Sequence, residues 1–291
     1  MSTDKIRLMA HLVAGYPDDS GCRAVAQGLV EGGASYLEVQ IPFSDPSADG
    51  PAIREAGSAV LASGYRVRDA LAFVAELCSA YPGVPVFVMT YGSLAASPDV
   101  HAFVEIVRKA GAAGLIVPDF PFDADEGLAQ TCLGGGRLVC PVPVAAPSMR
   151  PQRLAKMADL GREYLYAALR AGVTGAQTEI SEDTKAFLAA AGAGGARILG
   201  GFGIRTAEQT RKVAPYVHAV VAGSVFVELI TRIAGETAGS TGHQVGSAGE
   251  SAGSRGSGGS MSISERNEAL RQAVREKTAE LCGITDREAG Q

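Results

Sequence analysis

Two carboxylates that lie close together in the sequence, Glu38 and Asp49, are well suited to acid/base chemistry. Glu38 interrupts a short apolar run, residues 36–41, of the kind that forms a buried strand. Burying a charged carboxylate among apolar neighbours is costly unless the group is paired or has a task. Asp49 follows in a proline-rich loop that also holds Asp45. A carboxylate near a strand end and a second in a rigid loop could supply a general acid and a general base to one site.

Strand alternation predicts where these side chains point. Glu38 and Gln40 share one face of the expected strand, and Leu37, Val39 and Ile41 share the other. Each carboxylate also has a purely structural reading. Glu38 could be an interior charge paired with a lysine or arginine, and Asp49 could be a turn-forming aspartate before a glycine.

Short apolar runs that alternate with helical segments must position these groups. Eight strands are expected, at residues 7–14, 36–41, 84–90, 114–118, 137–144, 164–169, 197–200 and 219–222. Helices are expected between and after them, at residues 18–30, 52–62, 67–80, 99–110, 124–133, 152–160, 181–191, 207–215 and 225–233. Such alternation implies right-handed βαβ units and a parallel sheet. Eight units predict an α/β fold closed into a (β/α)8 TIM barrel; an open, doubly wound sheet is the alternative.

Glycines late in the chain predict a phosphate site. Barrels often hold phosphate at the loops after strands seven and eight, where a helix N-terminus offers free N–H groups. We expect phosphate contacts from the backbones of Gly175, Gly203, Gly223 and Ser224, and from the Ser224 hydroxyl. The alternative is that these glycines only permit tight turns between strands and helices.

Residues 36–51 resemble the signature of the tryptophan synthase α subunit family, which reads roughly E-L-G-x-P-F-S-D-P-x-A-D-G-P. Three further stretches, residues 166–175, 201–204 and 222–224, resemble the family's sixth, seventh and eighth loops. The resemblance runs from about residue 8 to residue 233, and more weakly over the last helix.

The resemblance implies a lyase that cleaves indole-3-glycerol phosphate to indole and glyceraldehyde 3-phosphate, in the last steps of L-tryptophan biosynthesis. By position, Glu38 is the acid/base at indole C3 and the glycerol hydroxyl, and Asp49 contacts the indole N–H. Thr174 holds Asp49 when the sixth loop closes, unless it is only a cap or turn residue. Three aromatic residues lie beside the indole, unless they are ordinary core side chains: Tyr91, Tyr166 and Phe202.

The resemblance also implies partners and cofactors. The chain itself needs no cofactor, and a β subunit carrying pyridoxal phosphate completes a cytoplasmic α2β2 heterotetramer. The family pattern is broken at four places: His11 replaces a phenylalanine, Val39-Gln40 replaces Leu-Gly, Ser47 replaces a leucine and Ser93 replaces an asparagine. Histidine makes the pocket more polar and introduces a group that can titrate near neutral pH.

The composition limits the remaining possibilities. The 291 residues, of which 46% are hydrophobic, suffice for one large barrel core, and a net charge of −5 gives no reason to expect nucleic acid or an anionic membrane as partner. The five cysteines and four histidines are scattered, so we expect reduced thiols and no metal site. The beginning of the sequence lacks the apolar core of a signal peptide.

Domain boundaries follow a change in composition. We expect the barrel over residues 1–234, a flexible Gly/Ser-rich linker or loop over 235–260, and a C-terminal segment, 261–291, whose helix over about 263–282 packs back on the barrel. Arg54 and Arg170 are the nearest cations by sequence, with surface roles expected.

Three functional alternatives stay open at this point. One is a stand-alone indole-releasing lyase, which the departures at His11, Gln40 and Ser47 keep in view. Another is a noncatalytic barrel that only activates a partner, against which the presence of both Glu38 and Asp49 argues. The third is a different phosphate-binding barrel enzyme, such as a sugar-phosphate isomerase, which the fold and phosphate loops alone would permit.

Overall fold

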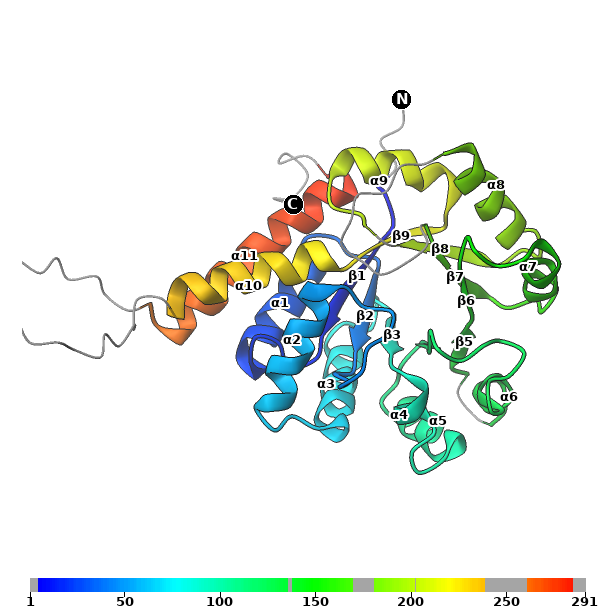
Figure 1. Ribbon diagram of the computed structural model, residues 1–291. Coiled ribbons are helices and arrows are strands. Elements are labelled where there is room, and N and C mark those ends of the chain that lie inside the picture. The colour runs from blue at the N-terminus through cyan, green and yellow to red at the C-terminus, as the bar shows by residue number, and fades with distance from the viewer. Residues whose placement is uncertain (1–4, 136–137, 170–180, 202, 239–260, 285–291) are drawn as a thin grey trace, which may run out of the picture.

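A parallel sheet forms the centre of the molecule (Figure 1). The computed structural model describes residues 5–135, 138–169, 181–201, 203–238 and 261–284. Within these ranges the strands are β1 Leu8–Val13, β2 Tyr36–Gln40, β3 Val86–Met89, β4 Gly114–Ile116, β5 Cys140–Val142, β6 Val144–Ala145, β7 Tyr164–Ala168, β8 Arg197–Gly201 and β9 Ala219–Ala222. Their order in the sheet is β5-β4-β3-β2-β1-β9-β8-β7-β6, and each bonded pair is parallel.

The sheet closes into a barrel through the fifth of the eight expected strands. Pro143 divides this strand into β5, which pairs with β4, and β6, which pairs with β7. Proline has no N–H to donate, so the strand breaks there. The Pro143 carbonyl still accepts a hydrogen bond from the Tyr166 N–H at 3.0 Å. The barrel prediction is confirmed, and the open-sheet alternative is wrong.

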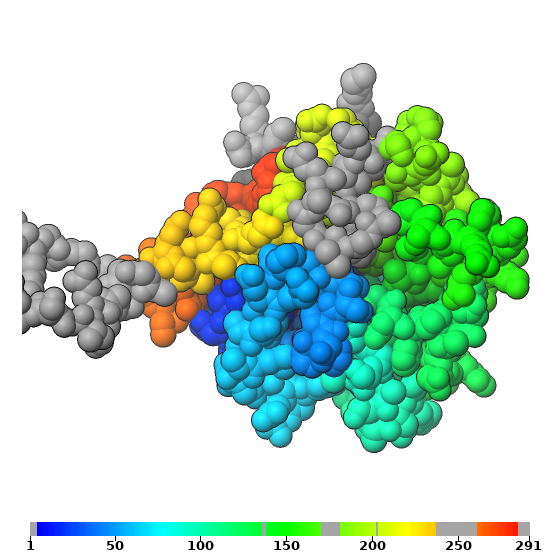
Figure 2. All heavy atoms as spheres, viewed as in Figure 1, coloured from blue at the N-terminus to red at the C-terminus, as the bar shows by residue number. Residues whose placement is uncertain are grey.

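Helices surround the barrel in the predicted order. They are α1 Asp19–Glu31, α2 Pro51–Ala62, α3 Val67–Ala80, α4 Gly92–Ala95, α5 Val100–Lys109, α6 Leu128–Leu133, α7 Pro151–Ala158, α8 Glu182–Ala191, α9 Ala207–Val213 with the 3-10 turn Ala214–Tyr216, α10 Ser224–Ala238 and α11 Ile263–Cys282. None of these described helices combines the length and the apolar character needed to cross a membrane. Figure 2 shows α2, in blue, against the first half of α10, in yellow.

Three helices differ from the sequence-based expectation. The short α4 was not expected. Helix α6 begins at Leu128 rather than near residue 124, because the Asp125 carboxylate accepts the N–H groups of Gly127 and Ala129 and Gly127 adopts a φ of +80°. Helix α10 continues to Ala238, so residues 235–238 are helical and do not belong to a linker. The remainder of the expected linker, residues 239–260, lies outside the described residues.

Side-chain alternation along the strands is confirmed. Leu37, Val39 and Ile41 are fully buried in the layer between barrel and helices. On the opposite face of β2, Tyr36 lies inside the barrel and Glu38 lines a pocket. The barrel interior therefore receives the side chains that could do chemistry.

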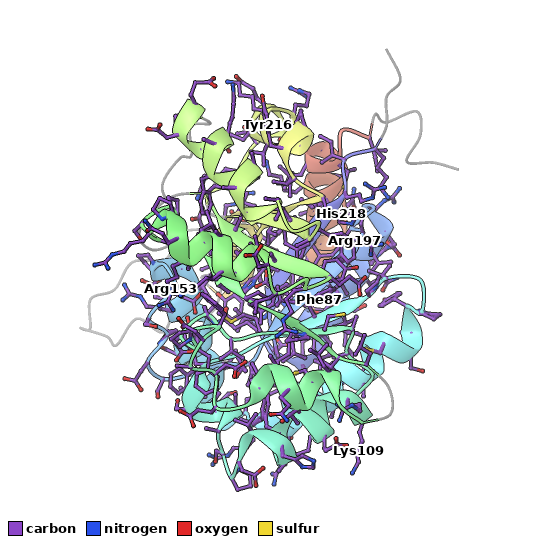
Figure 3. All side chains as sticks on the ribbon, turned by 90° about the vertical axis from the view of Figure 1, so that its right-hand side faces the viewer. Phe87, Lys109, Arg153, Arg197, Tyr216 and His218 are labelled. Atoms are coloured by element: carbon purple, nitrogen blue, oxygen red, sulfur yellow. The ribbon has the colours of Figure 1, made fainter. Side chains whose placement is uncertain are left out.

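Aromatic rings fill the barrel at the amino ends of the strands. The Tyr36 ring meets those of Phe87 and Tyr164 edge-on, at centroid distances of 5.9 and 6.2 Å. Tyr36 Oη and His218 Nε2 are hydrogen-bonded at 2.8 Å, and Arg197 lies over the Tyr164 ring. Figure 3 labels Phe87, Arg197 and His218 on this side of the molecule. Because these rings close one end of the barrel, a pocket into the described barrel interior opens at the other end.

The C-terminal helix α11, predicted over residues 263–282, packs along α1 and α10 (Figure 1). Gly28 and Gly32 let the α1 backbone approach α11 closely. A Cβ added at either glycine would lie 2.4 Å from a carbonyl oxygen of α11, that of Arg271 or Arg275. Leu270, Val274 and Leu281 are fully buried, so α11 is part of the core packing.

Replacing Gly28 by alanine is expected to destabilise the fold. The added methyl group would meet the Arg271 carbonyl, and overpacking of this kind typically costs about 1–3 kcal/mol. Gly57→Ala is the matched control, because its Cβ would meet nothing within 4 Å in helix α2. There alanine should stabilise the helix by about 0.5–1 kcal/mol. Thermal unfolding of both variants checks this; equal melting temperatures would contradict the close helix contact.

Candidate active site

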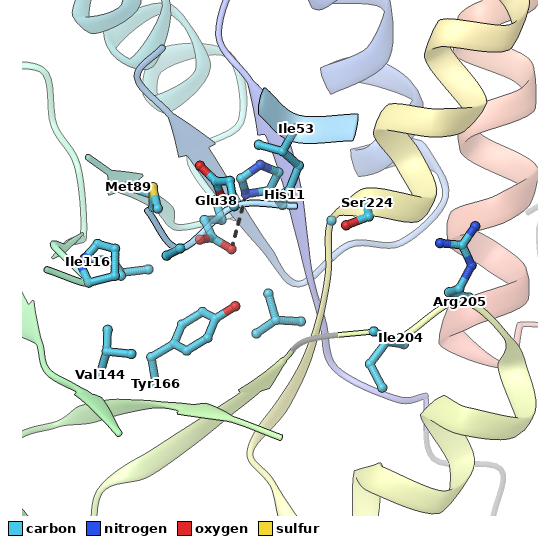
Figure 4. Close-up of a pocket in the computed structure, with 16 residues that line it drawn as sticks. His11, Glu38, Ile53, Met89, Ile116, Val144, Tyr166, Ile204, Arg205 and Ser224 are labelled. Carbon is cyan, nitrogen blue, oxygen red and sulfur yellow. Dashed lines mark ion pairs between the residues drawn. The ribbon is translucent and has the colours of Figure 1, made fainter. Parts of the chain in front are cut away.

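One pocket opens at the carboxyl ends of the barrel strands (Figure 4). The empty space in it, with the open mouth included, is about 660 Å³. In a (β/α)8 barrel this is the catalytic face. The pocket is lined by His11, Glu38, Ala48, Asp49, Ile53, Met89, Ile116, Pro118, Val144, Tyr166, Gly203, Ile204, Arg205, Val221, Gly223 and Ser224.

Glu38 and His11 form a buried pair on neighbouring strands. They are direct register partners on β2 and β1, and both side chains face the barrel interior. His11 Nδ1 lies 3.6 Å from Glu38 Oε2, and the two residues are 5% and 4% exposed. Burial alone would lower the pKa of His11, but the contact with Glu38 and its negative charge, with that of Asp49, outweigh burial and raise it. Glu38 is thus paired with a histidine rather than with a lysine or arginine.

Asp49 is held rigidly by two side-chain donors. Gln40 Nε2 donates to Asp49 Oδ2 at 2.6 Å, and the Tyr91 hydroxyl donates to the same oxygen at 2.8 Å. The residue is 4% exposed. Burial raises the pKa of Asp49 above its usual range, while the charge of His11 and these two hydrogen bonds partly oppose the rise.

Tyr91 supports the loop that carries Asp45 and Asp49, here called the acidic loop, and does not line the pocket. Besides donating to Asp49, its hydroxyl accepts the Ala48 N–H at 3.2 Å, and its ring stacks on Phe43 at 5.2 Å. The side chain is fully buried. Tyr91 therefore lies behind the loop and outside the cavity lining, and its place beside a bound ring stays a prediction.

Tyr166 enters the pocket from β7, opposite Glu38 (Figure 4). A Cβ at Gly201 would lie 2.7 Å from the Tyr166 hydroxyl, so the neighbouring strand must carry a glycine to admit the ring. Burial raises the pKa of Tyr166 well above its usual range, and the charges of Glu38 and Asp49 add to the rise. The phenol is therefore neutral at physiological pH.

Backbone at the start of α10 lines the pocket beside His11. Gly203 follows β8 with a φ of +78°, and Gly223 and Ser224 form the turn from β9 into α10. A 15-residue helix that begins here directs its free N–H groups and the positive end of its dipole to this corner. An anion such as phosphate fits that arrangement. Thr174, Gly175 and Phe202 lie outside the described residues.

The sequence interpretation missed the apolar wall and one cation. Four wall residues lie at or near strand ends and could have been found as the last inward-facing positions: Met89, Ile116, Val144 and Val221. The fifth, Ile53, comes from helix α2. Arg205 lines the pocket and forms a two-pronged ion pair with Glu228 of α10. Arg54, expected as a nearest cation, is exposed on α2, and Arg170 lies outside the described ranges.

These features define a class: a (β/α)8-barrel enzyme with two buried carboxylates facing an apolar pocket that ends at a helix N-terminus. Comparison with known proteins gives the particular family. The family model for "Tryptophan synthase alpha chain" matches residues 1–250. The tryptophan synthase alpha chain of Helicobacter hepaticus is 33% identical over 236 residues, covering 79% of this chain and 88% of that one.

Solved structures agree. A chain of Mycobacterium tuberculosis tryptophan synthase superposes with a TM-score of 0.74 at 29% identity, covering 96% of this chain and 94% of that one. A chain from the tryptophan synthase complex of Pyrococcus furiosus has the same fold, with a TM-score of 0.74 at 24% identity, 96% of this chain and 99% of that one being covered.

The chain belongs to the tryptophan synthase alpha chain family. It is a lyase, and its reaction is the cleavage of indole-3-glycerol phosphate in tryptophan biosynthesis. The family uses no cofactor in this chain, since pyridoxal phosphate belongs to the β subunit.

Proposed function

We propose that Glu38 and Asp49 are the catalytic residues of this cleavage. The observation that carries the proposal is their joint burial in a single apolar pocket in two different polar environments, Glu38 beside His11 and Asp49 hydrogen-bonded to Gln40 and Tyr91. Two carboxylates in unlike surroundings can hold different protonation states, which allows one site to run acid and base steps.

The chemistry assigns each carboxylate a task. Glu38 gives a proton to indole C3, which turns the ring into a leaving group, and then takes the proton of the glycerol 3-hydroxyl. The hydroxyl carbon becomes a carbonyl as its bond to indole C3 breaks, and the electron pair of that bond restores the aromatic ring. Asp49 accepts a hydrogen bond from the ring N–H and stabilises the positive charge that develops there. One proton passes from Glu38 to substrate and one returns.

Substrate binding follows from the remaining lining. Gly203, Gly223 and Ser224 offer N–H groups and a hydroxyl to the phosphate at the start of α10. Tyr166 and the apolar wall enclose the indole ring. Thr174, Gly175 and Phe202 keep the roles that the sequence motifs imply, with those motifs as their support.

We propose a separate β subunit as the partner, in an α2β2 assembly in the cytoplasm. Support comes from family membership and from the Pyrococcus furiosus relative, which was solved as a tryptophan synthase complex. The barrel with α11 packed on it, residues 1–238 and 261–291, is the proposed folding unit of this subunit.

Indole release from indole-3-glycerol phosphate, measured with the purified chain alone and with a β subunit, tests the partnership. Weak activity alone that rises at least about tenfold when a β subunit is added is expected, because a partner that binds the active arrangement of the site more tightly shifts the population toward it. Co-sedimentation of the two chains is the accompanying binding measurement. No binding and no stimulation would contradict the α-subunit proposal.

A stand-alone lyase is the second candidate, and one observation favours it. Gln40 and Tyr91 already pin Asp49 in the isolated chain, so one half of the site is ordered without a partner. In the same assay, high activity that a β subunit leaves unchanged would select this candidate.

A further inference from the structure

The contact between His11 and Glu38 puts a second titratable group in the catalytic pocket. Strands β1 and β2 are paired, and His11 and Glu38 lie directly opposite each other in that pairing. Because both side chains point into the barrel, they contact each other. His11 Nδ1 faces Glu38 Oε2 at 3.6 Å, and Figure 4 shows this contact as a dashed line. His11 Nε2 is buried and has no hydrogen-bond partner among the described residues.

We propose that His11 and Glu38 share one proton, and that His11 acts through Glu38 as a positioning residue for the cleavage. The inference rests on the proposed role of Glu38 and adds to it a proton reservoir. In the resting site the proton resides on the imidazole and Glu38 is a carboxylate, which the imidazolium orients. A tightening of the 3.6 Å contact to hydrogen-bond distance when substrate binds lets the proton cross to Glu38.

The proton balance closes over one turnover. The proton moves from His11 Nδ1 to Glu38 Oε2, and the Glu38 carboxyl group then delivers it to indole C3. The regenerated Glu38 carboxylate takes the proton of the substrate hydroxyl as the carbon–carbon bond breaks. That proton returns to His11, so the pair again holds one proton and no further reagent is consumed.

The groups around the pair favour the protonated imidazole. Asp49, at the end of the acidic loop, is the second carboxylate facing His11, and its charge also raises the pKa of His11. Tyr166, on β7, is a neutral phenol in the same pocket. Arg205, after β8, has its charge engaged by Glu228. On the β9 side, Gly223 and Ser224 bring no formal charge, but the positive end of the α10 dipole at this corner opposes protonation of His11.

Gly223 also limits how far His11 can move away from Glu38. A Cβ added at Gly223 would lie 3.2 Å from His11 Cβ, so backbone packs closely against the imidazole from the α10 side. Since β2 occupies the other side, the ring is confined beside Glu38. A confined donor supports transfer to one fixed acceptor, as the proposal requires.

The pH profile of kcat/KM for indole-3-glycerol phosphate tests the inference in His11→Phe and His11→Gln. The reaction requires that the His11–Glu38 pair carry one proton. The fall of kcat/KM at alkaline pH in the wild type therefore reports the raised pKa of His11, where that proton is lost. A carboxyl group left alone ordinarily releases its proton about two pH units below an imidazole, so the limb should move at least about one unit toward acid in both variants. Toward acid pH the variants should approach wild-type kcat.

Glutamine keeps a neutral amide in place of the ring, and phenylalanine is the residue that the family pattern has at this position. A shared shift therefore reports the loss of the titrating group rather than a packing defect. Unchanged alkaline limbs in both folded variants would overturn the inference.

A titration of the histidine ring signals by NMR provides a readout other than activity. The His11 signal is identified by its absence in His11→Gln. Its midpoint in the wild type should lie above the ordinary value of about 6.5 and should fall below it in Glu38→Gln, where burial remains and the carboxylate is lost. The same midpoint in both proteins would refute proton sharing.

The two proposals fail in different ways. If Glu38→Gln retains wild-type activity, the role proposed for Glu38 is wrong, and so is the proposal that His11 and Glu38 share a proton. If Glu38→Gln is inactive while both His11 variants keep the wild-type alkaline limb, only the reservoir is wrong.

Discussion

Replacing Glu38 by glutamine is expected to lower kcat for indole release by about 10³-fold, within the range of 10²–10⁴ that a positioned acid/base group supplies. The amide can neither deliver a proton to C3 nor accept the hydroxyl proton. The phosphate corner at Gly203, Gly223 and Ser224 is untouched, so KM should change little. Steady-state kinetics with indole-3-glycerol phosphate, alone and with a β subunit, measures both constants.

Glu208→Gln is the matched control for this prediction. Glu208 lies on α9, and its exposed carboxylate forms a surface ion pair with Lys212, of the kind that contributes little to stability. Its kcat should equal that of the wild type. A Glu38→Gln variant that folds and keeps even a tenth of wild-type kcat would remove Glu38 from the acid/base role.

Sequence reasoning succeeded where a local pattern decides the structure. Period-2 alternation placed Glu38 on the strand face opposite Leu37 and Val39, and the predicted start of the last helix at residue 263 coincides with the capping box of Ser262 and Glu265. The fold class followed from eight repeats of a strand followed by a helix. The order and approximate ends of the helices needed no knowledge of tertiary contacts.

Sequence reasoning failed where two segments that are distant in the sequence meet in the fold. Tyr91 and Asp49 are 42 positions apart, and only the folded loop shows that the tyrosine stands behind the carboxylate. The same holds for Gly28 on α1, whose lack of a side chain matters because α11 returns to it. A sequence pattern reports the face on which a residue lies, but not what covers that face.

Two departures from the family pattern turn out to contact the two candidate carboxylates. His11 pairs with Glu38, and Gln40 donates to Asp49. Each was visible in the sequence as an unusual residue, but its partner depends on strand register and on the path of the acidic loop. Together they place two polar side chains against the two candidate carboxylates.

Asp49→Asn is expected to lower kcat by about 10²–10³-fold, the loss seen when one preorganised group that stabilises transition-state charge is removed. The amide is nearly the same size, and its oxygen can accept the hydrogen bonds from Gln40 and Tyr91. The pocket should therefore keep its shape and the protein should fold. What is lost is the negative charge that offsets the positive ring nitrogen.

The same variant should be more stable than the wild type at neutral and alkaline pH. Burial raises the folded-state pKa of Asp49 above its unfolded value. A carboxyl group shifted in this direction contributes stability below its unfolded pKa of about 3.9, and the contribution is lost as pH rises through the folded pKa. Asparagine stays neutral, so its melting temperature should exceed that of the wild type at pH 8, with the difference shrinking toward pH 4. A variant that is inactive and also less stable at pH 8 would mean that Asp49 serves the fold and not the reaction.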